Sequence, residues 1–312
     1  MTTAVLWMSY LAAPAARAGG LQWNQFDVVT SGNFSSSSDV EGWTMVGGNV
    51  TGSWNGSLHQ KTPATTPTVY VGGTLSGNLN LQYGSVRIAS AGDHSGATVN
   101  FNGGSGAGYI YDTSTDKVAT DIQTVTSQLS SAHSGFDGLT ANNTASITGS
   151  TLTFSATSYN AQGLAVFDVT TTELSGLSAI QLGTVGSQVK GIIINVSSNG
   201  GTRTTLSESA NFNGWNTTTD AMTLWNFGSD VTSITANTAW QGSMIALGAQ
   251  LSNQNDMNGG VYVQSLDASS EVHLPLYSGP TVASVPEPST LALAGIGIAG
   301  ALVMASRRRR SP

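Results

Sequence analysis

Cysteine is absent from this chain of 312 residues. Its absence excludes disulfide bonds, thiolate metal sites and cysteine nucleophiles together. Charge is scarce as well, because charged residues make up 9% of the chain, against about 25% in an average soluble protein. The chain is instead rich in glycine, with 38 residues, and most of its polar side chains are Ser, Thr and Asn. We therefore expect a surface that is solvated by neutral hydroxyl and amide groups.

Basic side chains are especially few between the two ends of the chain. Residues 19–285 contain 16 acidic residues and carry a net charge of about −11. The five basic residues of this stretch are Lys61, Arg87, Lys117, Lys190 and Arg203. Binding to nucleic-acid phosphates needs clustered Lys and Arg side chains, so the composition argues against nucleic acid as a partner.

Residue patterns for metal or acid–base chemistry are also missing. The sequence has no His-Glu-x-x-His motif and no two histidines four positions apart, which is the spacing that binds zinc from one helix. Glu271 and His273 occupy alternate positions of an expected strand, so both side chains lie on one face. A structural hydrogen bond is favoured there over a metal site or an acid–base pair.

Two further acidic groups could contact a calcium ion. Asp39 and Glu41 share one face of an expected strand, and Asn255 and Asp256 lie in an expected turn. Neither group has the number of oxygen ligands of a calcium-binding loop. We therefore predict no catalytic residue, no metal ligand and no cofactor.

Three other features allow a function without requiring one. The glycine-rich segment FNGGSGAGYIYD (residues 101–112) lacks the Lys-Ser/Thr pair of a phosphate-binding loop, so we expect a loop that leads to a helix. Five tryptophans suit stacking on sugars but are expected to pack in the core: Trp43, Trp54, Trp215, Trp225 and Trp240. Six Asn-x-Ser/Thr glycosylation sequences are expected by chance in such a composition: Asn33, Asn49, Asn55, Asn142, Asn195 and Asn216.

The first 18 residues predict an export signal. An apolar stretch from Ala4 to Ala13 precedes the small-x-small triplet Ala16, Arg17 and Ala18, which is typical of signal-peptidase cleavage. The positive charges that usually precede the apolar stretch are missing. We predict a signal peptide over residues 1–18, with Ala16 and Ala18 as its cleavage residues.

The opposite end of the chain predicts a short membrane helix. Residues 291–305 carry no charge, and a helix over residues 289–306 would be roughly 27 Å long, just short of the ~30 Å hydrocarbon core of a bilayer. Three glycines weaken this helix as a permanent anchor. The cluster Arg307, Arg308, Arg309 and Arg310 orients it, so that the last residues stay cytoplasmic and everything before Pro286 lies outside.

The motif before this helix makes its role more specific. Pro286, Glu287 and Pro288, followed by a short apolar helix and terminal arginines, resemble the PEP-CTERM sorting signal of exported bacterial proteins. The resemblance implies that an exosortase recognises Pro-Glu-Pro and processes the protein at the membrane. The prolines suit this role because they keep the recognition segment extended and outside the helix. A plain C-terminal membrane anchor is the alternative.

The body between the two ends predicts an all-β fold. Short apolar runs such as TVYVGGTL, GIIINV and GGVYVQSL are separated by Gly, Asn and Ser clusters. Their spacing suits a β-solenoid, that is a parallel β-helix with Gly and Asn at its corners, and a β-sandwich is the alternative. One helix is expected over residues 115–132, where Val118, Ile122, Val125 and Leu129 form an apolar stripe. It should start at Ser114 or Thr115, end at Gly135 and pack along a sheet.

The body also resembles a known family over nearly its whole length. FDVVTSGNFSSSSDVEGWTMVGGNV at its start and GSMIALGAQLSNQNDMNGGVYVQSLDASSEVHLPLYSG at its end are similar to choice-of-anchor A domains. Leu247 and Gly248 stand where many relatives have Pro-Asn, and Leu276 and Tyr277 stand where a Phe is usual. The resemblance implies an ice-binding-like or adhesin-like β-solenoid with one long helix alongside, and it favours the solenoid over the sandwich.

Together these patterns predict a three-part chain. A signal peptide (1–18) precedes a β-helical domain (19–280) and a PEP-CTERM tail (281–312). We expect a non-enzymatic structural or adhesive protein at the cell surface, in the outer envelope or in the extracellular matrix. Before processing, the C-terminal helix would hold it in the inner membrane. Its expected partners are an exosortase and an exopolysaccharide or other surface ligand, and the alternatives are a polysaccharide-active enzyme or an ice-binding protein.

Overall fold

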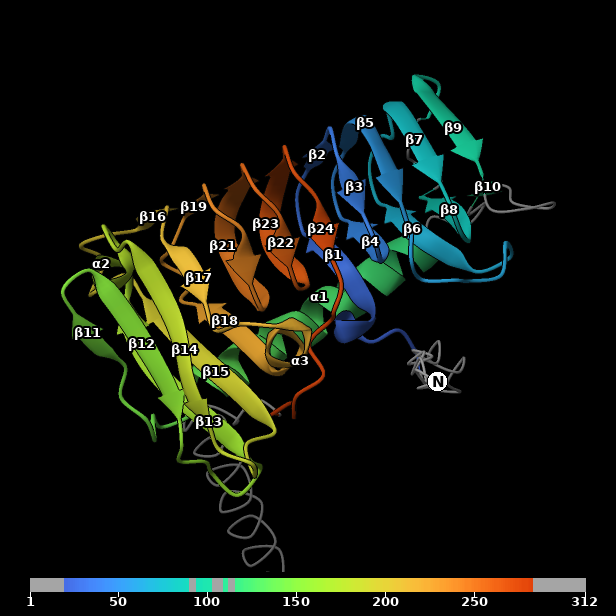
Figure 1. Ribbon diagram of the computed structural model, residues 1–312. Helices are drawn as coiled ribbons and strands as arrows, with labels where there is room; N and C mark the ends of the chain where they lie inside the picture. Colours follow the sequence, from blue (N-terminus) through green and yellow to red (C-terminus); the bar gives the residue numbers. More distant parts are fainter. Residues whose placement is uncertain (1–19, 90–93, 103–108, 112–115, 283–312) are drawn as a thin grey trace, which may run out of the picture.

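The computed structural model describes residues 20–89, 94–102, 109–111 and 116–282. They form a β-solenoid in which short, mostly parallel strands stack into walls, with one long helix lying along the outside (Figure 1). The predicted β-solenoid with a helix packed alongside is thus confirmed. The alternative, a β-sandwich, would require two antiparallel sheets, whereas the strands of the main sheet pair in parallel.

The first part of the chain starts with a short 3-10 helix, η1 (Trp23–Gln25). Its strands are β1 (Phe26–Thr30), β2 (Phe34–Ser36), β3 (Asp39–Val40), β4 (Trp43–Val46), β5 (Val50–Gly56), β6 (Pro67–Val71), β7 (Gly77–Leu81), β8 (Ser85–Ile88), β9 (Ala97–Phe101) and β10 (Tyr109–Tyr111). Strand β10 lies within the glycine-rich segment that was expected to be a loop. That expectation is wrong at residues 109–111, because their backbone pairs with β8.

The long helix α1 (Asp116–Asp137) separates the two parts of the solenoid. The strands after it are β11 (Ser146–Thr148), β12 (Thr151–Ala156), β13 (Leu164–Thr170), β14 (Ala179–Val185), β15 (Gly191–Ser197), β16 (Thr205–Glu208), β17 (Asn211–Asn213), β18 (Thr223–Phe227), β19 (Ser233–Ala236), β20 (Trp240–Gln241), β21 (Ser243–Asn253), β22 (Met257–Asn258), β23 (Val261–Ala268) and β24 (Val272–His273). Two short helices, α2 (Thr171–Leu174) and α3 (Thr217–Met222), lie between them.

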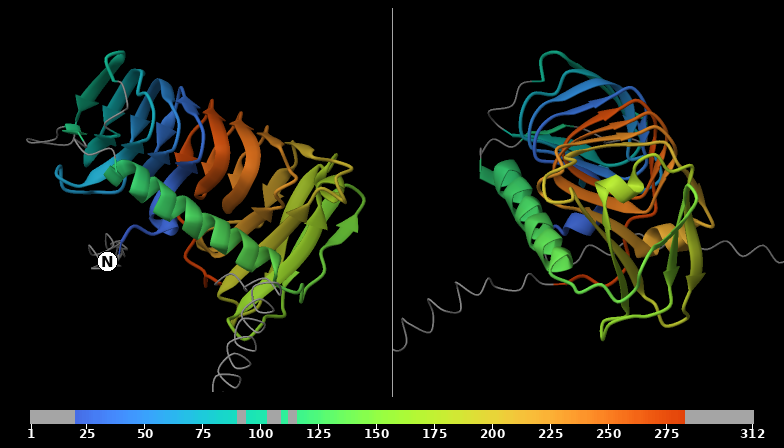
Figure 2. Two further views of the ribbon diagram at one scale, coloured as in Figure 1. Left: turned by 180° about the vertical axis from the view of Figure 1, so that it is seen from behind. Right: turned by 90° about the vertical axis from the view of Figure 1, so that its left-hand side faces the viewer.

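The first coil of the chain lies in the middle of the solenoid, next to the last coil. Strands β1 to β10 stack away from the middle, and α1 returns along the whole length of the molecule (Figure 2). Strands β11 to β24 then stack back towards the middle. The last coil meets the first there, because β23 pairs with β1 and β2, and β24 pairs with β3. We call this junction of the first and last coils the seam.

One wall of the solenoid is buried on both sides. It contains β1, β4, β6, β8, β10, β13, β15, β18 and the first halves of β21 and β23. In β15, Ile192 and Ile194 point into the solenoid core, whereas Ile193 packs on the opposite side with residues of α1. A sheet covered on both sides needs a continuous apolar run, which explains the run GIIINV. We call it the helix-covered wall.

The other two walls have one side in water. The hydroxyl wall contains β2, β16, β19, the first half of β5 and the second halves of β21 and β23. The amide wall contains β3, β7, β9, β20, β22, β24 and the second half of β5. Strands such as β19 alternate between buried and partly exposed residues, as expected for strands with one solvated side. At the far end a separate sheet of β11, β12, β14 and β17 completes the structure.

Helix α1 packs on the helix-covered wall, as its apolar stripe predicts. Val118, Val125, Leu129 and Ala132 are buried. The helix does not end at Gly135 but continues to Asp137, because Phe136 is fully buried and contacts the ring of Tyr277 edge-on at 6.1 Å. Residues 114 and 115, the expected start of the helix, lie outside the described residues.

Glycines form one corner of the N-terminal coils. The Val-Gly-Gly motif recurs at residues 46–48 and 71–73, and in both coils it follows a strand of the helix-covered wall. A Cβ atom at Gly47 would lie 2.4 Å from the backbone oxygen of Ser31, and one at Gly72 would lie 2.5 Å from that of Gly47. Only glycine permits this close approach of successive coils.

Candidate functional site

The residues predicted to direct export lie outside the described part of the chain. They are Ala16, Ala18, Pro286, Glu287, Pro288, Arg307, Arg308, Arg309 and Arg310. Residues 289–306, the expected membrane helix, lie outside it as well. Within the described ranges, no helix is long and apolar enough to cross a membrane. The roles of these residues therefore stay predictions, and the structure offers the walls of the solenoid as candidate sites.

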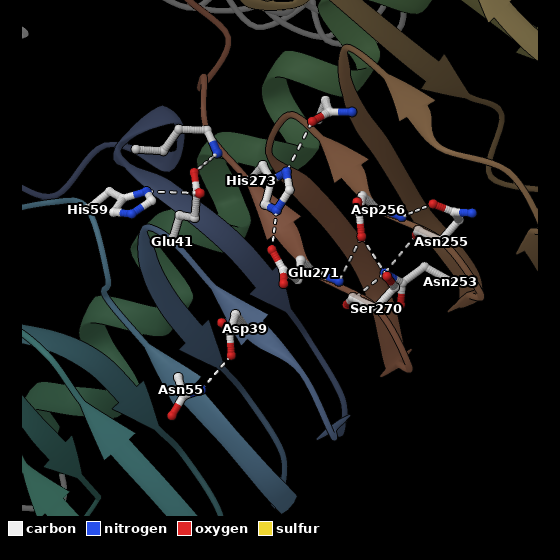
Figure 3. A network of polar contacts seen from close by, with 12 residues as sticks. Asp39, Glu41, Asn55, His59, Asn253, Asn255, Asp256, Ser270, Glu271 and His273 are labelled. Atoms are coloured by element: carbon white, nitrogen blue, oxygen red, sulfur yellow. Dashed lines mark hydrogen bonds and ion pairs between the residues drawn. The ribbon is translucent and has the colours of Figure 1, made fainter.

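The seam gathers polar residues that are far apart in the sequence (Figure 3). Strand β24 lies between β3 and β22, because Val272 pairs with both Val40 and Met257. This register brings three short segments of polar residues close to one another. They contain Asp39 with Glu41, Asn255 with Asp256, and Glu271 with His273. The sequence does not reveal that these segments are neighbours. The four carboxylates of the resulting seam cluster belong to Asp39, Glu41, Asp256 and Glu271, and its two imidazoles belong to His59 and His273.

His273 makes the hydrogen bond to Glu271 that was predicted from their alternate strand positions. Its Nε2 lies 2.5 Å from Glu271 Oε2, and its Nδ1 lies 3.2 Å from Asn258 Oδ1. Burial by itself would lower the pKa of His273. The hydrogen bond with Glu271 and the negative charges of Glu41, Asp256 and Glu271 outweigh that effect, so the pKa lies above its ordinary value of 6.5.

Glu41 connects the first coil to the segment that follows the last one. Its Oε2 accepts a hydrogen bond from the backbone N–H of Leu274 at 2.9 Å, and its Oε1 lies 2.9 Å from Nδ1 of His59. Its own backbone N–H donates to the carbonyl oxygen of Val272 at 3.0 Å. Sequence reasoning missed these partners, because Leu274 lies 233 positions from Glu41.

The remaining carboxylates of the cluster are also engaged within the protein. Asp256 Oδ1 accepts a hydrogen bond from Ser270 Oγ at 2.5 Å, and Asp39 Oδ1 accepts one from Asn55 Nδ2 at 2.6 Å. The described residues contain no group of three or more His, Asp or Glu side chains that could hold a metal ion. The contacts seen at the seam connect its strands.

A ladder of asparagine side chains extends from the seam along the amide wall. Asn100 donates to Asn80 at 2.9 Å, and Asn80 donates to Asn55 at 2.8 Å. Asn55 in turn donates to Asp39, so the ladder ends on a carboxylate. The ladder is visible in the sequence only once the coil lengths of 20 and 25 residues are known.

The hydroxyl wall carries a second array of polar side chains. Strand pairing places one row of outward side chains in register across six strands: Ser207, Thr235, Ser252, Asp267, Ser35 and Thr51. A parallel row lies two positions earlier on four of these strands: Thr205, Ser233, Gln250 and Ser265. All of these residues are exposed or partly exposed. Adjacent strands are about 4.8 Å apart, so the wall presents a regular array in which Asp267 is the only charged member.

Three carboxyl groups lie buried away from these surfaces. Asp27, Glu208 and Asp220 are each at most 4% exposed, and each has one carboxyl oxygen without a hydrogen-bond partner. Burial raises the pKa of Asp27 well above its ordinary value, raises that of Glu208, and raises that of Asp220 to about 7. A protonated carboxyl group is the form that such sites favour.

The tryptophans and the glycosylation sequences have structural roles. Trp54, Trp225 and Trp240 are buried inside the solenoid, and Trp43 and Trp215 are partly buried against the core clusters, which confirms packing rather than sugar stacking. The six asparagines of the sequences make hydrogen bonds at coil corners, in polar ladders or at a helix start: Asn33, Asn49, Asn55, Asn142, Asn195 and Asn216.

Comparison with known proteins relates the chain to two families. The family model described as a putative ice-binding-like adhesive domain matches residues 21–274, and the model of the PEP-CTERM protein-sorting motif matches residues 284–310. No curated protein matches the chain. Among solved structures, the Shewanella frigidimarina ice-binding protein_1 DUF3494 domain is similar, with 10% sequence identity over 82% of this chain and 95% of that chain and a TM-score of 0.31.

The two family matches confirm the resemblances expected from the sequence. The first covers almost the entire described part of the chain, and the second covers the Pro-Glu-Pro segment, the apolar stretch and the arginines. The chain therefore belongs to the family of putative ice-binding-like adhesive domains and ends in a PEP-CTERM sorting motif, as an exported surface protein does.

Proposed function

We propose that this protein is a non-enzymatic adhesin that binds neutral polysaccharide at the cell surface or in the extracellular matrix through its hydroxyl wall. Residues 1–18 direct export, and an exosortase reads Pro286, Glu287 and Pro288 and processes the tail (281–312). Until then, the helix over residues 289–306 holds the chain in the inner membrane, with Arg307 to Arg310 on the cytoplasmic side. The membership of an adhesive-domain family and the sorting motif support this proposal.

The array on the hydroxyl wall is the observation that carries the adhesive role. Apart from Gln250, its side chains are short, so little conformational entropy is lost when they are held by a ligand. They are almost all neutral donors and acceptors in strand register, which suits the repeated hydroxyl groups of a neutral glycan. A polyanionic glycan suits the wall less well, because the body of the protein is itself strongly acidic.

The described part of the chain begins and ends away from this wall. Gln22, near the start of the described chain, and Val282, at its end, line one groove of about 660 Å³ together with Gln123 and Gln128 of α1. Both ends therefore lie on the side of α1 (Figure 2). A tail attached at this side can hold the protein at a membrane while the hydroxyl wall remains available.

Binding of the exported protein to a neutral β-glucan and to a polyuronate tests the proposal. We expect binding to the neutral glycan, and we expect the double variant Thr235→Arg/Ser252→Arg to weaken it at least tenfold, because the long side chains separate the glycan from the wall. The matched control Ser127→Arg/Ser131→Arg, on exposed positions of α1, should bind as the wild type does. Equal binding by both double variants would contradict the role of the wall.

Ice binding is the second candidate, favoured by the description of the matching family. The Thr-rich segment NTTTDAMT (residues 216–223) does not lie on a flat wall, because Thr217–Met222 form α3. The flat hydroxyl wall is thus the candidate ice-binding surface, although Asp267 interrupts its neutral row. Thermal hysteresis that the Thr235→Arg/Ser252→Arg variant abolishes would establish this function in place of adhesion. Turnover of a neutral or acidic glycan would instead establish the enzymatic alternative.

A further inference from the structure

His273 lies at the weakest part of the seam. On the helix-covered and hydroxyl walls, the first and last coils pair through three residue pairs each, between β1 and β23 and between β2 and β23. On the amide wall, β3 and β24 pair only through Val40 and Val272. Closure of this third wall therefore depends on side chains more than closure of the other two.

The geometry around His273 suits a protonated imidazole. Both ring nitrogens face an oxygen that accepts a hydrogen bond, Glu271 Oε2 directly before β24 and Asn258 Oδ1 on β22. An imidazole donates from both nitrogens only in its positively charged form. His273 is partly buried, with 23% of its side chain exposed, so bulk water replaces these partners poorly.

The charged groups around His273 are otherwise almost all negative. Glu271 directly precedes β24, Glu41 follows β3, and Asp256 precedes β22. His59 pairs with Glu41 from the segment after β5. Among the described residues, the ion pairs of these carboxylates are those of Glu41 with His59 and of Glu271 with His273, and none is made by lysine or arginine.

We propose that His273 is a proton-dependent clasp that closes the amide wall at the seam. While it carries a proton, its positive charge offsets the negative charges of the carboxylates on the two sides of the contact between β3 and β24. When it loses the proton, the carboxylates of Glu41, Asp256 and Glu271 repel one another and the contact between β3 and β24 opens. The opening includes the hydrogen bond from Leu274 to Glu41, at the start of the segment (274–282) that leads to the C-terminal tail.

The sign of the pH dependence follows from the pKa of His273. Since this pKa is higher in the folded protein than the ordinary value of 6.5, the clasp contributes its full stability below about pH 6.5. The contribution is lost as the pH rises through the folded-state pKa. The contact between β3 and β24 is thus more stable at pH 6 than at pH 9.

Hydrogen exchange of the full exported protein at pH 6 and pH 9, corrected for intrinsic exchange rates, tests the clasp. We expect protection of the peptides covering residues 39–46 and 270–277 to fall at pH 9 at least fivefold more than that of the peptide of β15 (191–197), which reports the global loss of stability that groups such as Asp220 cause. In His273→Gln, seam protection should be low at both pH values. In His273→Arg, a permanent cation should keep it high at both.

Two outcomes would overturn the proposal. One is equal seam protection of the wild type at both pH values. The other is the same loss of protection at pH 9 in His273→Arg as in the wild type, which would assign the loss to another group. If the variants do not fold, salt supplies the test in the wild type. Repulsion between carboxylates is screened at 0.5 M NaCl, so the loss at pH 9 must shrink there, and a loss that salt leaves unchanged contradicts the clasp.

Discussion

Single buried carboxyl groups make the stability of the solenoid depend on pH. Asp220, in α3, is 4% exposed, and one of its carboxyl oxygens has no hydrogen-bond partner. Burial raises its pKa from 3.8 to about 7. Folding therefore retains a proton that the unfolded chain releases between about pH 4 and pH 7. The stability that this proton supplies is present in acid and is lost as the pH rises through 7.

The variant Asp220→Asn should remove this dependence. Over the range from pH 4 to pH 8, we expect the wild type to lose about 3 to 4 kcal/mol more unfolding free energy than the variant does, because each pKa unit corresponds to about 1.4 kcal/mol. Urea denaturation at a series of pH values measures the difference. Asp267→Asn, which changes an exposed carboxylate of the hydroxyl wall, should keep the wild-type slope. Identical slopes for all three proteins would show that Asp220 is ionised in the fold.

Burial of this kind could not be predicted from the sequence. The segment from Asn216 to Asp220 contains a helix start that is recognisable in principle, since Asn216 caps α3 and an acidic residue occupies the first turn. The sequence does not show which side of α3 faces the protein. The burial of Asp220 depends on that packing, so the sequence suggests an ordinary exposed residue.

At the scale of elements, a polar ladder holds the end of α1 on the sheet. Asn195 donates to the carbonyl oxygen of Phe136 at 3.0 Å, and Asn226 donates to that of His133 at 3.3 Å. Asn226 also donates to Asn195 at 2.9 Å, and Nδ1 of His133 lies 2.7 Å from Asn226 Oδ1. The last carbonyl groups of a helix lack partners within it. Here Asn195 of β15 gives the carbonyl oxygen of Phe136 a donor in addition to the backbone N–H of Leu139, and Asn226 of β18 gives one to that of His133.

Removal of a buried asparagine of this ladder should therefore lower the unfolding free energy more than removal of an asparagine on a solvent-exposed side of a wall. We expect Asn195→Ala to lower the unfolding free energy by about 2 to 3 kcal/mol, because it leaves buried polar groups without partners. Asn80→Ala interrupts the asparagine ladder on the solvent side of the amide wall and should cost less than about 1 kcal/mol. Chemical denaturation of both variants gives the comparison. Equal losses would mean that the ladder beneath α1 does not stabilise the helix end.

The apolar stripe of α1 and its ladder differ in how far the sequence predicts them. The stripe follows from spacing within one segment, so the helix and its buried side could be predicted from Val118 to Ala132. The ladder combines residues that are 59 and 93 positions apart, and only the coil register brings them together. For the same reason, the position of Gly135 suggested the wrong helix end.

At the scale of the whole molecule, the order of assembly is the feature that the sequence does not reveal. Short apolar runs, glycine corners and family resemblance predict a solenoid. They do not predict that the first coil lies in the middle and pairs with the last one. Parallel pairing of β1 with β23 joins residues more than 230 positions apart, and no local pattern encodes such a contact. The seam cluster therefore could not be predicted, although each of its residue pairs was recognisable.

The whole chain combines this closed solenoid with two end segments that we propose direct its export. Both described ends lie on the side of α1, and the C-terminal one continues into the sorting motif at residues 284–310. This arrangement suits a protein that is first held at the membrane by its tail and then released or transferred with its hydroxyl wall free. We propose that the tail is a sorting signal that is processed and not a permanent membrane anchor.

The mass of the mature C-terminus tests that claim most directly. It should be measured by mass spectrometry of the full protein recovered from cells with and without the exosortase. We expect a chain shortened near Pro286, Glu287 and Pro288 when the enzyme is present, and a chain that still ends in the arginine cluster when it is absent. An intact tail in both cells would contradict the account and leave the apolar stretch as a plain membrane anchor.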